Sequence, residues 1–382
     1  MENVLIGAIL SFAITFYAIP IIIRIADMAK LYDHPGERKI HAAPIPSLGG
    51  LGIFGGFLTA FLLLANISTA VDSFQYFIGA FIIVFFFGMK DDVLVITPMK
   101  KLLGQVLAAV ILMFKCNLLL HNMHGFLNIT TINLPISYCL TLFTIIVVMN
   151  AYNLIDGVDG LAASIGIITS SFFSFFFYSN GDYFFSMMGF CLAASLIGFL
   201  LYNFSPAKIF MGDTGSMFTG IINAILVIRF ISTAEDSHIF PILASPAMGF
   251  GVLALPLLDT LRVFAIRIAH GRSPFSPDRN HLHHLLLDKG YSHRAITLLL
   301  SAATLFFIGF SYLTLSMGTT KVIAAQVVLF FAGILVIRMS KARPVQMKAI
   351  KTISSADEIS ADIKSHIVRL VSNPAEAMAE NE

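Results

Sequence analysis

The sequence predicts an all-α integral membrane protein, built as a polytopic bundle of ten or eleven transmembrane helices. Of its 382 residues, 57% are hydrophobic and only 12% are Asp, Glu, Lys or Arg, whereas soluble globular proteins carry about 25% charged residues. The mean hydropathy is +0.85. The apolar residues also gather into runs long enough to cross a bilayer, which is the second observation behind this fold class.

Eleven apolar runs are candidate spans, because a transmembrane helix needs about 20 apolar residues, or somewhat fewer where protein shelters its ends. The first run lacks the basic region and cleavage site of a signal peptide, so we expect a retained helix. The fifth is short and is expected to end at Met149. The ninth contains Pro241, Pro246 and Pro256, and we expect it to bend and open a lipid-facing groove. The runs cover residues 3–23, 48–66, 74–89, 102–119, 134–149, 161–179, 184–202, 215–232, 240–266, 295–316 and 321–338.

The basic residues fall on alternate loops and predict the orientation of the chain. By the positive-inside rule, the loops that hold them face the cytoplasm, so we expect the N-terminus outside and the C-terminus inside. We expect one membrane catalytic domain over residues 1–338 and a basic, partly disordered cytoplasmic tail over residues 339–382. Nearly all 24 Lys and Arg lie in or beside residues 24–47, 90–101, 203–214 and 267–294 and the tail, with Lys115, Arg229 and Lys321 as exceptions.

Two further features narrow the class of protein. Cys116, Cys139 and Cys191 stand singly within apolar runs, so we expect neither disulfides nor a cysteine metal site. The net charge of +2 does not support binding to nucleic acid. The lipid bilayer is the partner that the composition predicts.

Most of the acidic and histidine-rich motifs fall on the expected cytoplasmic side, where they are expected to converge on one end of the bundle. The adjacent Asp91 and Asp92 need a neutralising cation, although Lys90, Lys100 or Lys101 would also serve. The motifs are "RKIHAAPIPSLGG" (38–50), "GMKDDVL" (88–94), "NAYNLIDGVDGLA" (150–162), "NFSPAKIFMGDTGS" (203–216) and "SPFSPDRNHLHHLLLDKG" (273–290).

Three more carboxylates stand in these motifs. Asp156 and Asp159 are spaced i, i+3, which places both on one face if they form a helical turn. Asp213 stands at the start of a span among small residues, where free backbone N–H groups favour anions and a carboxylate can also bind a metal. Together with Asp91 and Asp92 they make five carboxylates, a set that suits a hard cation such as Mg²⁺.

The histidine motif holds His281, His283 and His284 beside Arg279. A zinc site has little support, because neither cysteines nor an i, i+4 histidine pair is present. Phosphate binding or acid–base chemistry fits these residues better. Lys39 and His41 are weaker candidates for the same anions, and Lys39 is equally well explained as a positive-inside charge.

In this order and on one membrane side, the four motifs from residue 88 onward resemble those of the polyprenyl-phosphate N-acetylhexosamine-1-phosphate transferases. The likeness covers roughly residues 1–340. "SPFSPDRNHLHHL" is similar to the branch that uses a UDP-N-acetylhexosamine (the WecA and TagO type) more than to the MraY branch, which transfers phospho-MurNAc-pentapeptide. The resemblance implies transfer of N-acetylhexosamine 1-phosphate, most simply GlcNAc 1-phosphate, to undecaprenyl phosphate with release of UMP. It also implies dependence on Mg²⁺ or Mn²⁺ and a site on the cytoplasmic face of a bacterial inner membrane.

The resemblance assigns roles to individual residues. Asp213 matches the metal ligand, and Asp91 and Asp92 match residues that deprotonate or orient the lipid phosphate or assist the metal. Phe210 matches a residue that stacks on uracil, with an ordinary core phenylalanine as the alternative. The nucleotide site would be lined by Asn153, Asp156, Asp159 and Asn203, and the pyrophosphate or sugar phosphate would be held by Arg279, His281, His283 and His284.

Several alternatives stay open at this point. One is an MraY-like enzyme, and another is a two-step reaction through a phospho-aspartyl intermediate. A transporter or lipid-binding protein without catalysis is a third, although such proteins often show inverted repeats and midplane charges, and neither is visible here. The sequence leaves open the sugar epimer, the downstream surface polysaccharide (O-antigen, teichoic acid or capsule) and the oligomeric state, for which a homodimer is compatible.

Overall fold

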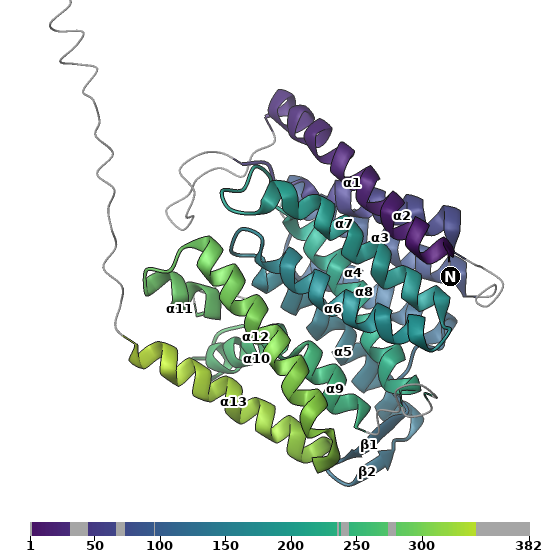
Figure 1. Cartoon of the computed structure of the whole chain (residues 1–382), viewed down its shortest axis with the longest axis vertical. Coiled ribbons are helices and arrows are strands. Elements are labelled where there is room, and N and C mark those ends of the chain that lie inside the picture. The colour runs from purple at the N-terminus through teal and green to yellow at the C-terminus, as the bar shows by residue number, and fades with distance from the viewer. Residues whose placement is uncertain are drawn as a thin grey trace, which may run out of the picture. The chain divides into compact units, whose positions relative to one another are not determined.

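The computed structural model describes residues 2–30, 45–65, 73–94, 96–234, 237, 244–273 and 280–340. Within these residues the chain is mostly helical, as predicted (Figure 1). The helices are α1 (Glu2–Ala29), α2 (Gly49–Leu64), α3 (Phe74–Leu94), α4 (Pro98–Lys115), α5 (Leu134–Ile155), α6 (Leu161–Ser179), α7 (Tyr183–Asn203), α8 (Gly212–Thr233), α9 (Ser245–Val252), α10 (Ala254–Ala269), α11 (Leu282–Asp288), α12 (His293–Thr314), the 3₁₀ turn η2 (Leu315–Met317) and α13 (Thr319–Met339). The tail from residue 341 lies outside the described residues.

A helix, or a bent pair of helices, lies at each of the eleven expected ranges. Seven are long and apolar enough to cross a membrane, and the pair α9–α10 makes an eighth if it counts as one span. The seven are α1, α5, α6, α7, α8, α12 with η2, and α13. The protein is therefore a multi-pass helical membrane protein, while the count of ten or eleven spans and the orientation of the termini remain proposals.

The helix α8 lies at the centre of the bundle. It packs against α2, α3, α5 and α6, and 94% of its most apolar stretch is buried. Its small residues allow close packing, which is one of the forces that associate helices in lipid. A Cβ atom on Gly220 would lie 2.6 Å from Cα of Met149 on α5, and one on Gly88 of α3 would lie 2.6 Å from Cα of Thr214. The helices that carry the acidic motifs are thus held in direct backbone contact.

The fifth span differs from the prediction. We expected it to end at Met149, but α5 continues without a break to Ile155. The polar residues in its last turns do not end the helix because they find partners on neighbouring helices. Asn150 donates from Nδ2 to Oε1 of Gln105 on α4, at 2.9 Å, and Asn153 bonds to residues of α4 and α8.

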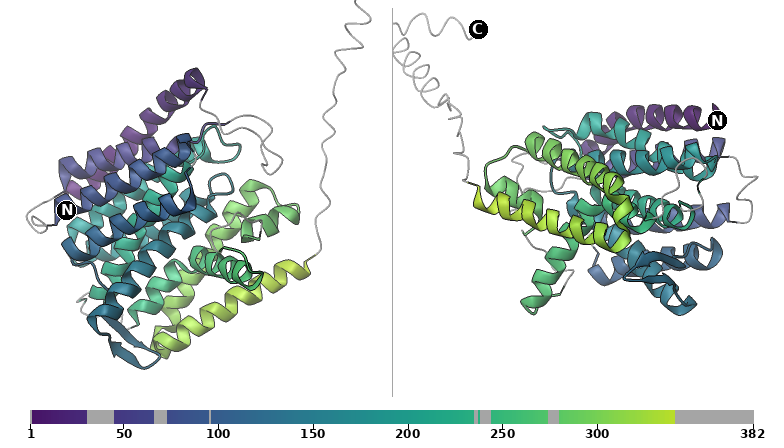
Figure 2. Two further views of the ribbon diagram at one scale, coloured as in Figure 1. Left: turned by 180° about the vertical axis from the view of Figure 1, so that it is seen from behind. Right: turned by 60° about the horizontal axis from the view of Figure 1, so that its bottom comes forward.

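The expected bend in the ninth span is present, with an angle of 79° between α9 and α10. Pro256 stands in the first turn of α10, where its missing N–H leaves no helical hydrogen bond unmade. A small antiparallel hairpin, β1 (Asn122–Phe126) and β2 (Ile129–Thr131), was not predicted. Figures 1 and 2 show it at the end of the bundle near the start of α13, and Thr319 donates to the carbonyl of His124 there.

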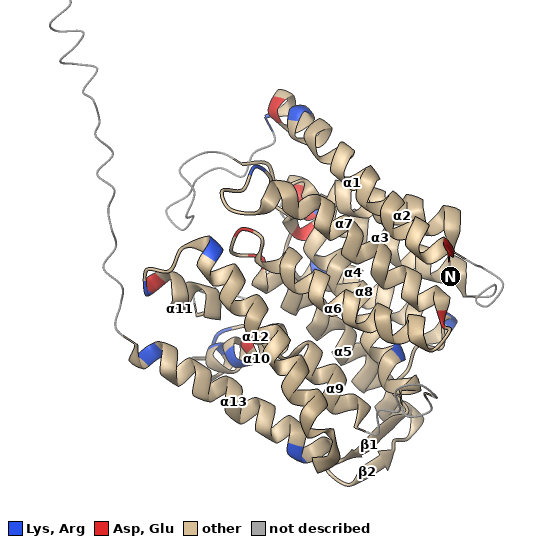
Figure 3. Cartoon of the chain, in the orientation of Figure 1, with Lys and Arg blue, Asp and Glu red and all other residues tan. Residues whose placement is uncertain are grey.

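Charged side chains gather near the ends of helices, and most helices are free of them along much of their length (Figure 3). One exception is α10, where Asp259, Arg262 and Arg267 are buried within the helix. Because an ionisable group inside a membrane bundle is costly, it marks a functional site by default.

Candidate active site

The end of α3 meets the beginning of α8 through Asp92. Its Oδ1 accepts a hydrogen bond from the backbone N–H of Asp213, at 2.6 Å, and its Oδ2 accepts from the backbone N–H and the hydroxyl of Thr214, at 3.0 and 2.5 Å. A carboxylate at a helix N-terminus satisfies free N–H groups and complements the helix dipole. Asp92 therefore caps α8 from another helix, and its oxygen atoms are already engaged by that turn.

Gly212 permits this arrangement. Its φ of +71° lies in the left-handed region, and a Cβ atom there would lie 2.7 Å from the Asp92 oxygens. The preceding residues also pair with the segment around residue 47, since Phe210 donates to the carbonyl of Pro46 and accepts from the N–H of Gly49. This pairing fixes Phe210 three residues before Asp213, with its ring partly exposed.

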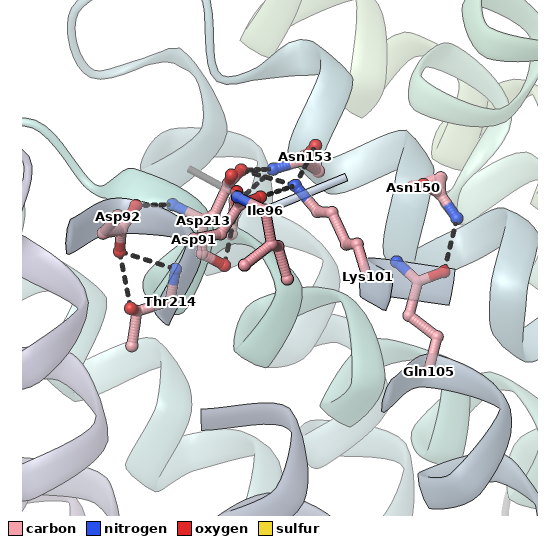
Figure 4. Close-up of polar contacts among 10 residues, drawn as sticks. Asp91, Asp92, Ile96, Lys101, Gln105, Asn150, Asn153, Asp213 and Thr214 are labelled. Atoms are coloured by element: carbon pink, nitrogen blue, oxygen red, sulfur yellow. Dashed lines mark hydrogen bonds and ion pairs between the residues drawn. The ribbon is translucent and has the colours of Figure 1, made fainter. Parts of the chain in front are cut away.

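Lys101 on α4 lies at the centre of the acidic cluster (Figure 4). Its Nζ is 2.8 Å from Oδ1 of Asp213, 3.2 Å from Oδ2 of Asp91 and 3.1 Å from Oδ1 of Asn153. Asn153 also donates to Asp213 and to the hydroxyl of Ser216. Four helices, α3, α4, α5 and α8, thus bring one cation and two carboxylates together. The sequence placed Lys101 only among three lysines that could neutralise Asp91 and Asp92.

The chemistry of this cluster fits a divalent cation. Mg²⁺ prefers carboxylate and amide oxygens, and oxygens of Asp91, Asp213 and Asn153 converge on a point that a positive charge, the ammonium of Lys101, already occupies. Among the described residues, no three His, Cys, Asp or Glu side chains form a ready metal cage. Mg²⁺ commonly takes several of its ligands from water or phosphate, so two carboxylates and an amide oxygen are donors that it could use here.

Asp156 ends α5 beside this cluster. Burial raises the pKa of Asp156 to about 8, and the negative charges of Asp213, Asp92 and Asp159 act in the same direction. Without an added cation, this carboxyl group is therefore largely protonated at neutral pH. A positive charge bound nearby favours its ionised form, so its protonation is linked to cation binding.

Asp159 lies in a different environment, so the expected helical turn with both aspartates on one face is wrong. Residues 156–160 form a non-helical turn between α5 and α6, with Gly160 at a φ of +76°. Oδ1 of Asp159 is 3.1 Å from Nδ1 of His293 at the start of α12, and Oδ2 accepts from the N–H of Ala207. Asp159 thus ties the turn to α12 and to the segment after α7.

Asn203 makes a similar structural connection. Its Oδ1 accepts from the N–H of Gly160, and its Nδ2 donates to the carbonyl of Ile209, each at 2.8 Å. The side chain is buried. It holds the turn after α5 against the segment that leads to Phe210. The oxygen and the nitrogen of its side-chain amide each make a hydrogen bond within the protein.

The first histidine of the "HLHH" motif is buried against α10. Nδ1 of His281 is 3.0 Å from Oδ2 of Asp259, and the N–H of Leu282 donates to the same carboxylate at 3.0 and 3.1 Å. Arg262 donates to Oδ1 of Asp259 at 2.7 Å. Sequence reasoning missed Asp259, Arg262 and Arg267, although charged residues within an apolar span were a signal that could have found them.

The other two histidines lead back toward the acidic cluster. His283 is buried, and a Cβ atom on Gly157 would overlap its ring. Burial lowers the pKa of His283 to about 3, and His284 and His281 act in the same direction, so its ring is neutral. His284 is partly exposed, with its ring centroid 4.3 Å from that of His283. Of the remaining predicted site residues, Lys39, His41 and Arg279 lie outside the described residues.

The fold and the site together define a class, a multi-pass helical membrane protein with a cluster of acidic, basic and amide side chains at the meeting point of four helices. Comparison with known proteins defines the family within this class. A sequence model of glycosyl transferase family 4 matches residues 74–231, a range that contains α3 to α7 and all but the last two residues of α8, and therefore Asp91, Lys101, Asn153 and Asp213.

Curated relatives extend the similarity along the chain. The decaprenyl-phosphate N-acetylglucosaminephosphotransferase of Mycobacterium leprae is 33% identical over 325 residues, which are 77% of this chain and 82% of the relative. The probable undecaprenyl-phosphate N-acetylglucosaminyl 1-phosphate transferase of Bacillus subtilis is 33% identical over 351 residues, 89% of this chain and 91% of the relative. The undecaprenyl-phosphate alpha-N-acetylglucosaminyl 1-phosphate transferase of Yersinia pestis is 30% identical over 306 residues, 78% and 80% of the two chains. This chain belongs to the polyprenyl-phosphate N-acetylhexosamine-1-phosphate transferase family, which confirms the resemblance of its motifs.

Proposed function

We propose that this chain transfers N-acetylglucosamine 1-phosphate from UDP-GlcNAc to undecaprenyl phosphate, producing undecaprenyl-pyrophosphoryl-GlcNAc and UMP. The relatives are named for this transfer to undecaprenyl or decaprenyl phosphate. The observation that carries the proposal is the convergence of Lys101, Asp91, Asp213 and Asn153 from four helices. This first membrane step would begin a cell-surface polysaccharide.

In the proposed reaction, an oxygen of the lipid phosphate attacks the β-phosphorus of UDP-GlcNAc. A new P–O bond forms there while the bond from this phosphorus to the bridging oxygen breaks, and that oxygen leaves as part of UMP. Both reactants are anions, so the protein mainly has to neutralise charge and align the two phosphates. The ammonium group of Lys101 contacts Asp91 and Asp213. During the reaction it would also interact with phosphate oxygens.

The two adjacent aspartates would have different roles. Oδ1 of Asp91 is held by the N–H of Ile96, at 2.8 Å, while Oδ2 faces Lys101. Asp91 is therefore placed to orient the lipid phosphate or accept its proton, whereas Asp92 supports the first turn of α8. Asp213 and Asp91 would hold Mg²⁺ or Mn²⁺, which supplies charge neutralisation on the pyrophosphate when bound.

The nucleotide would lie beside the turn after α5. Asn153 and Asp156 stand next to Asp213, and Phe210, which is partly exposed, would stack on uracil. We place this site on the cytoplasmic face of a bacterial inner membrane, with the N-terminus outside, ten or eleven spans and residues 339–382 as a cytoplasmic tail. A homodimer is part of the same proposal.

The test uses the full-length protein purified in detergent with undecaprenyl phosphate and a panel of UDP-N-acetylhexosamines. UMP release and formation of the lipid-linked sugar are measured with Mg²⁺, with Mn²⁺ and after chelation. We expect both products with UDP-GlcNAc and either metal, and neither after chelation. Transfer of phospho-MurNAc-pentapeptide instead would identify the MraY-type activity, and solute binding without UMP release would contradict an enzyme. Exchange of labelled UMP into UDP-GlcNAc without lipid would favour the two-step route.

A further inference from the structure

The buried group around Asp259 organises the histidine motif. Asp259, His281 and Arg267 are 4%, 3% and 2% exposed, respectively, so none of them offers much surface to a substrate. Asp259 receives hydrogen bonds from the side chain of His281, the backbone N–H of Leu282 and the guanidinium of Arg262. Arg262 also donates to the carbonyl of Asn280. One carboxylate thus fixes both the entry to α11 and the ring of its first histidine.

The partners of His281 determine which ring nitrogen carries the proton. Nη2 of Arg267 lies 3.5 Å from Nε2 of His281, and a guanidinium can only donate. Nε2 must therefore accept, and Nδ1 must carry the proton that it donates to Asp259. Both ring nitrogens are committed to protein partners. A histidine held in this way orients its neighbours and does not itself contact the substrate.

The orientation of His281 is passed on through ring packing. The rings of His281 and His283 are nearly parallel, with 4° between their planes and 5.7 Å between centroids, and His283 packs in turn on His284. His283 also fills the space above Gly157, where a Cβ atom would lie 2.9 Å from its Cε1. The next residue back along the chain is Asp156, whose carboxyl group feels the charges of Asp213 and Asp92.

We propose that Asp259 is a positioning residue, which holds His281 and the first turn of α11 so that His283 lies against the turn that carries Asp156 and His284 packs on His283. This proposal rests on the proposed transferase function. Of the three histidines, His281 then has a positioning role, and His283 and His284 lie closer to the reacting groups. The position of α11, on which a full active site depends, is set by a single carboxylate inside α10.

The first test compares Asp259→Asn with Asp182→Asn. The control changes another aspartate that is paired with an arginine, Arg229, at the opposite end of the bundle. Asparagine keeps the size of Asp259, but its NH₂ group must face either Nδ1 of His281 or the guanidinium of Arg262, both of which donate to Asp259. We expect kcat and kcat/KM for UDP-GlcNAc to fall together by about 10- to 100-fold, the usual loss when the partner that orients a histidine is removed. KM and the thermal unfolding midpoint should stay near wild type, and the control should be fully active.

A second pair of variants leaves Asp259 and Arg262 intact in case Asp259→Asn does not fold. His281→Asn can still donate from Nδ2 to Asp259, whereas His281→Ala cannot. We expect His281→Asn to retain activity within about tenfold of wild type and His281→Ala to lose as much as Asp259→Asn. If the folded His281→Asn protein is as inactive as His281→Ala, His281 contacts the substrate and the proposal is wrong. Wild-type activity in Asp259→Asn overturns it as well.

A structural measurement separates this proposal from the proposed function. Backbone hydrogen–deuterium exchange of residues 281–288 is measured in wild type, His281→Asn and His281→Ala. We expect α11 to exchange faster only in His281→Ala. This result without any transferase activity in wild type would refute the proposed function while supporting Asp259 as the anchor of α11. Unchanged exchange in His281→Ala, with an active wild type, would refute the anchor alone.

Discussion

Lys101 on α4 and Asp213 on α8 form an ion pair, with Nζ and Oδ1 2.8 Å apart and both side chains largely shielded from water. This contact joins two helices that carry opposite charges at the same end of the bundle. Within the part of the chain that the structure describes, Lys101 thus places a positive charge in direct contact with Asp213, the residue that matches the family's metal ligand.

Replacement of Lys101 by Met should remove charge neutralisation from the reacting phosphates. We expect kcat to fall by about 10²- to 10³-fold, the range for loss of one preorganised electrostatic group in an active site. The measurement is the initial rate of UMP release at saturating substrates. The matched control is Lys115→Met, at the other end of α4 over the ring of Tyr76, which should keep normal activity. Normal activity of Lys101→Met would show that Lys101 has a structural role only.

Substitution of Asp92 should mainly lower stability, whereas substitution of Asp91 should mainly lower activity. Asp92→Ala removes the cap of α8, and loss of an N-terminal cap costs about 0.5–2 kcal/mol of folding free energy. We therefore expect a lower thermal unfolding midpoint for Asp92→Ala, whereas Asp91→Ala should unfold near the wild-type temperature but lose most of its turnover. Fluorescence-detected unfolding and UMP release on the same preparations decide between them. An unchanged midpoint for Asp92→Ala would contradict the capping role.

Substitution of Asp159 should lower the stability of the protein more than its affinity for the nucleotide. Its carboxylate accepts a hydrogen bond from the N–H of Ala207 and lies 3.1 Å from Nδ1 of His293, and a hydrogen bond to a charged group contributes about 1.5–3 kcal/mol. Asp159→Ala should lower the unfolding midpoint, and UMP affinity measured below that midpoint should stay close to wild type. Strong loss of UMP affinity in a protein of normal stability would instead place Asp159 in the nucleotide site.

The raised pKa of Asp156, about 8 and due first to burial, predicts a pH-dependent stability. In the unfolded chain this carboxyl group loses its proton near its ordinary pKa of 3.8, so between about pH 4 and 8 the folded state binds more protons. Its contribution to stability therefore falls as pH rises through this window. The midpoint of Asp156→Asn relative to wild type should rise from pH 5 to pH 8 in chelator, and added Mg²⁺ should reduce the difference. A pH-independent difference would argue against the raised pKa.

Gly157 should be needed for its lack of a side chain. Gly157→Ala would push the ring of His283 away from the turn after α5, and a small misplacement in an active site can cost about 10²-fold in rate. We expect a large loss of kcat with little loss of folded protein. The control is Gly79→Ala on α3, where a Cβ atom meets nothing within 4 Å. Full activity of Gly157→Ala would show that His283 can move without consequence.

Much of the fold was predictable because apolar runs and punctuating loops are local properties of the sequence. A helix lies at every expected range, and the bend in the ninth span follows its prolines. The end of α5 was not predictable in this way, because Asn150 and Asn153 are polar in sequence but satisfied by Gln105 and Ser216 in space. The partners of a polar side chain in a membrane helix come from other helices, which periodicity does not reveal.

The site residues also fall into those that the sequence could predict and those that depend on the folded structure. Asp91, Asp92 and Asp213 could be found because they stand in recognisable motifs, and the structure brings them together. Asp259 could not be found from the histidine motif, since the two are joined only by folding of α10 against α11. The different surroundings of Asp156 and Asp159 were also hidden, because a turn with glycine at positive φ breaks the helical spacing that their sequence separation suggested.

The contact between α3 and α4 has a consequence for how the helices come together. Asp91 and Lys101 are only ten residues apart in sequence and are paired across the loop that joins their two helices. The Asp91 carboxylate can therefore be neutralised as soon as α3 and α4 pack together, before α8 brings Asp213 to the same lysine. A charge pair formed within one helical hairpin lets these two helices associate without leaving Asp91 as an unpaired ionised group at the end of the bundle.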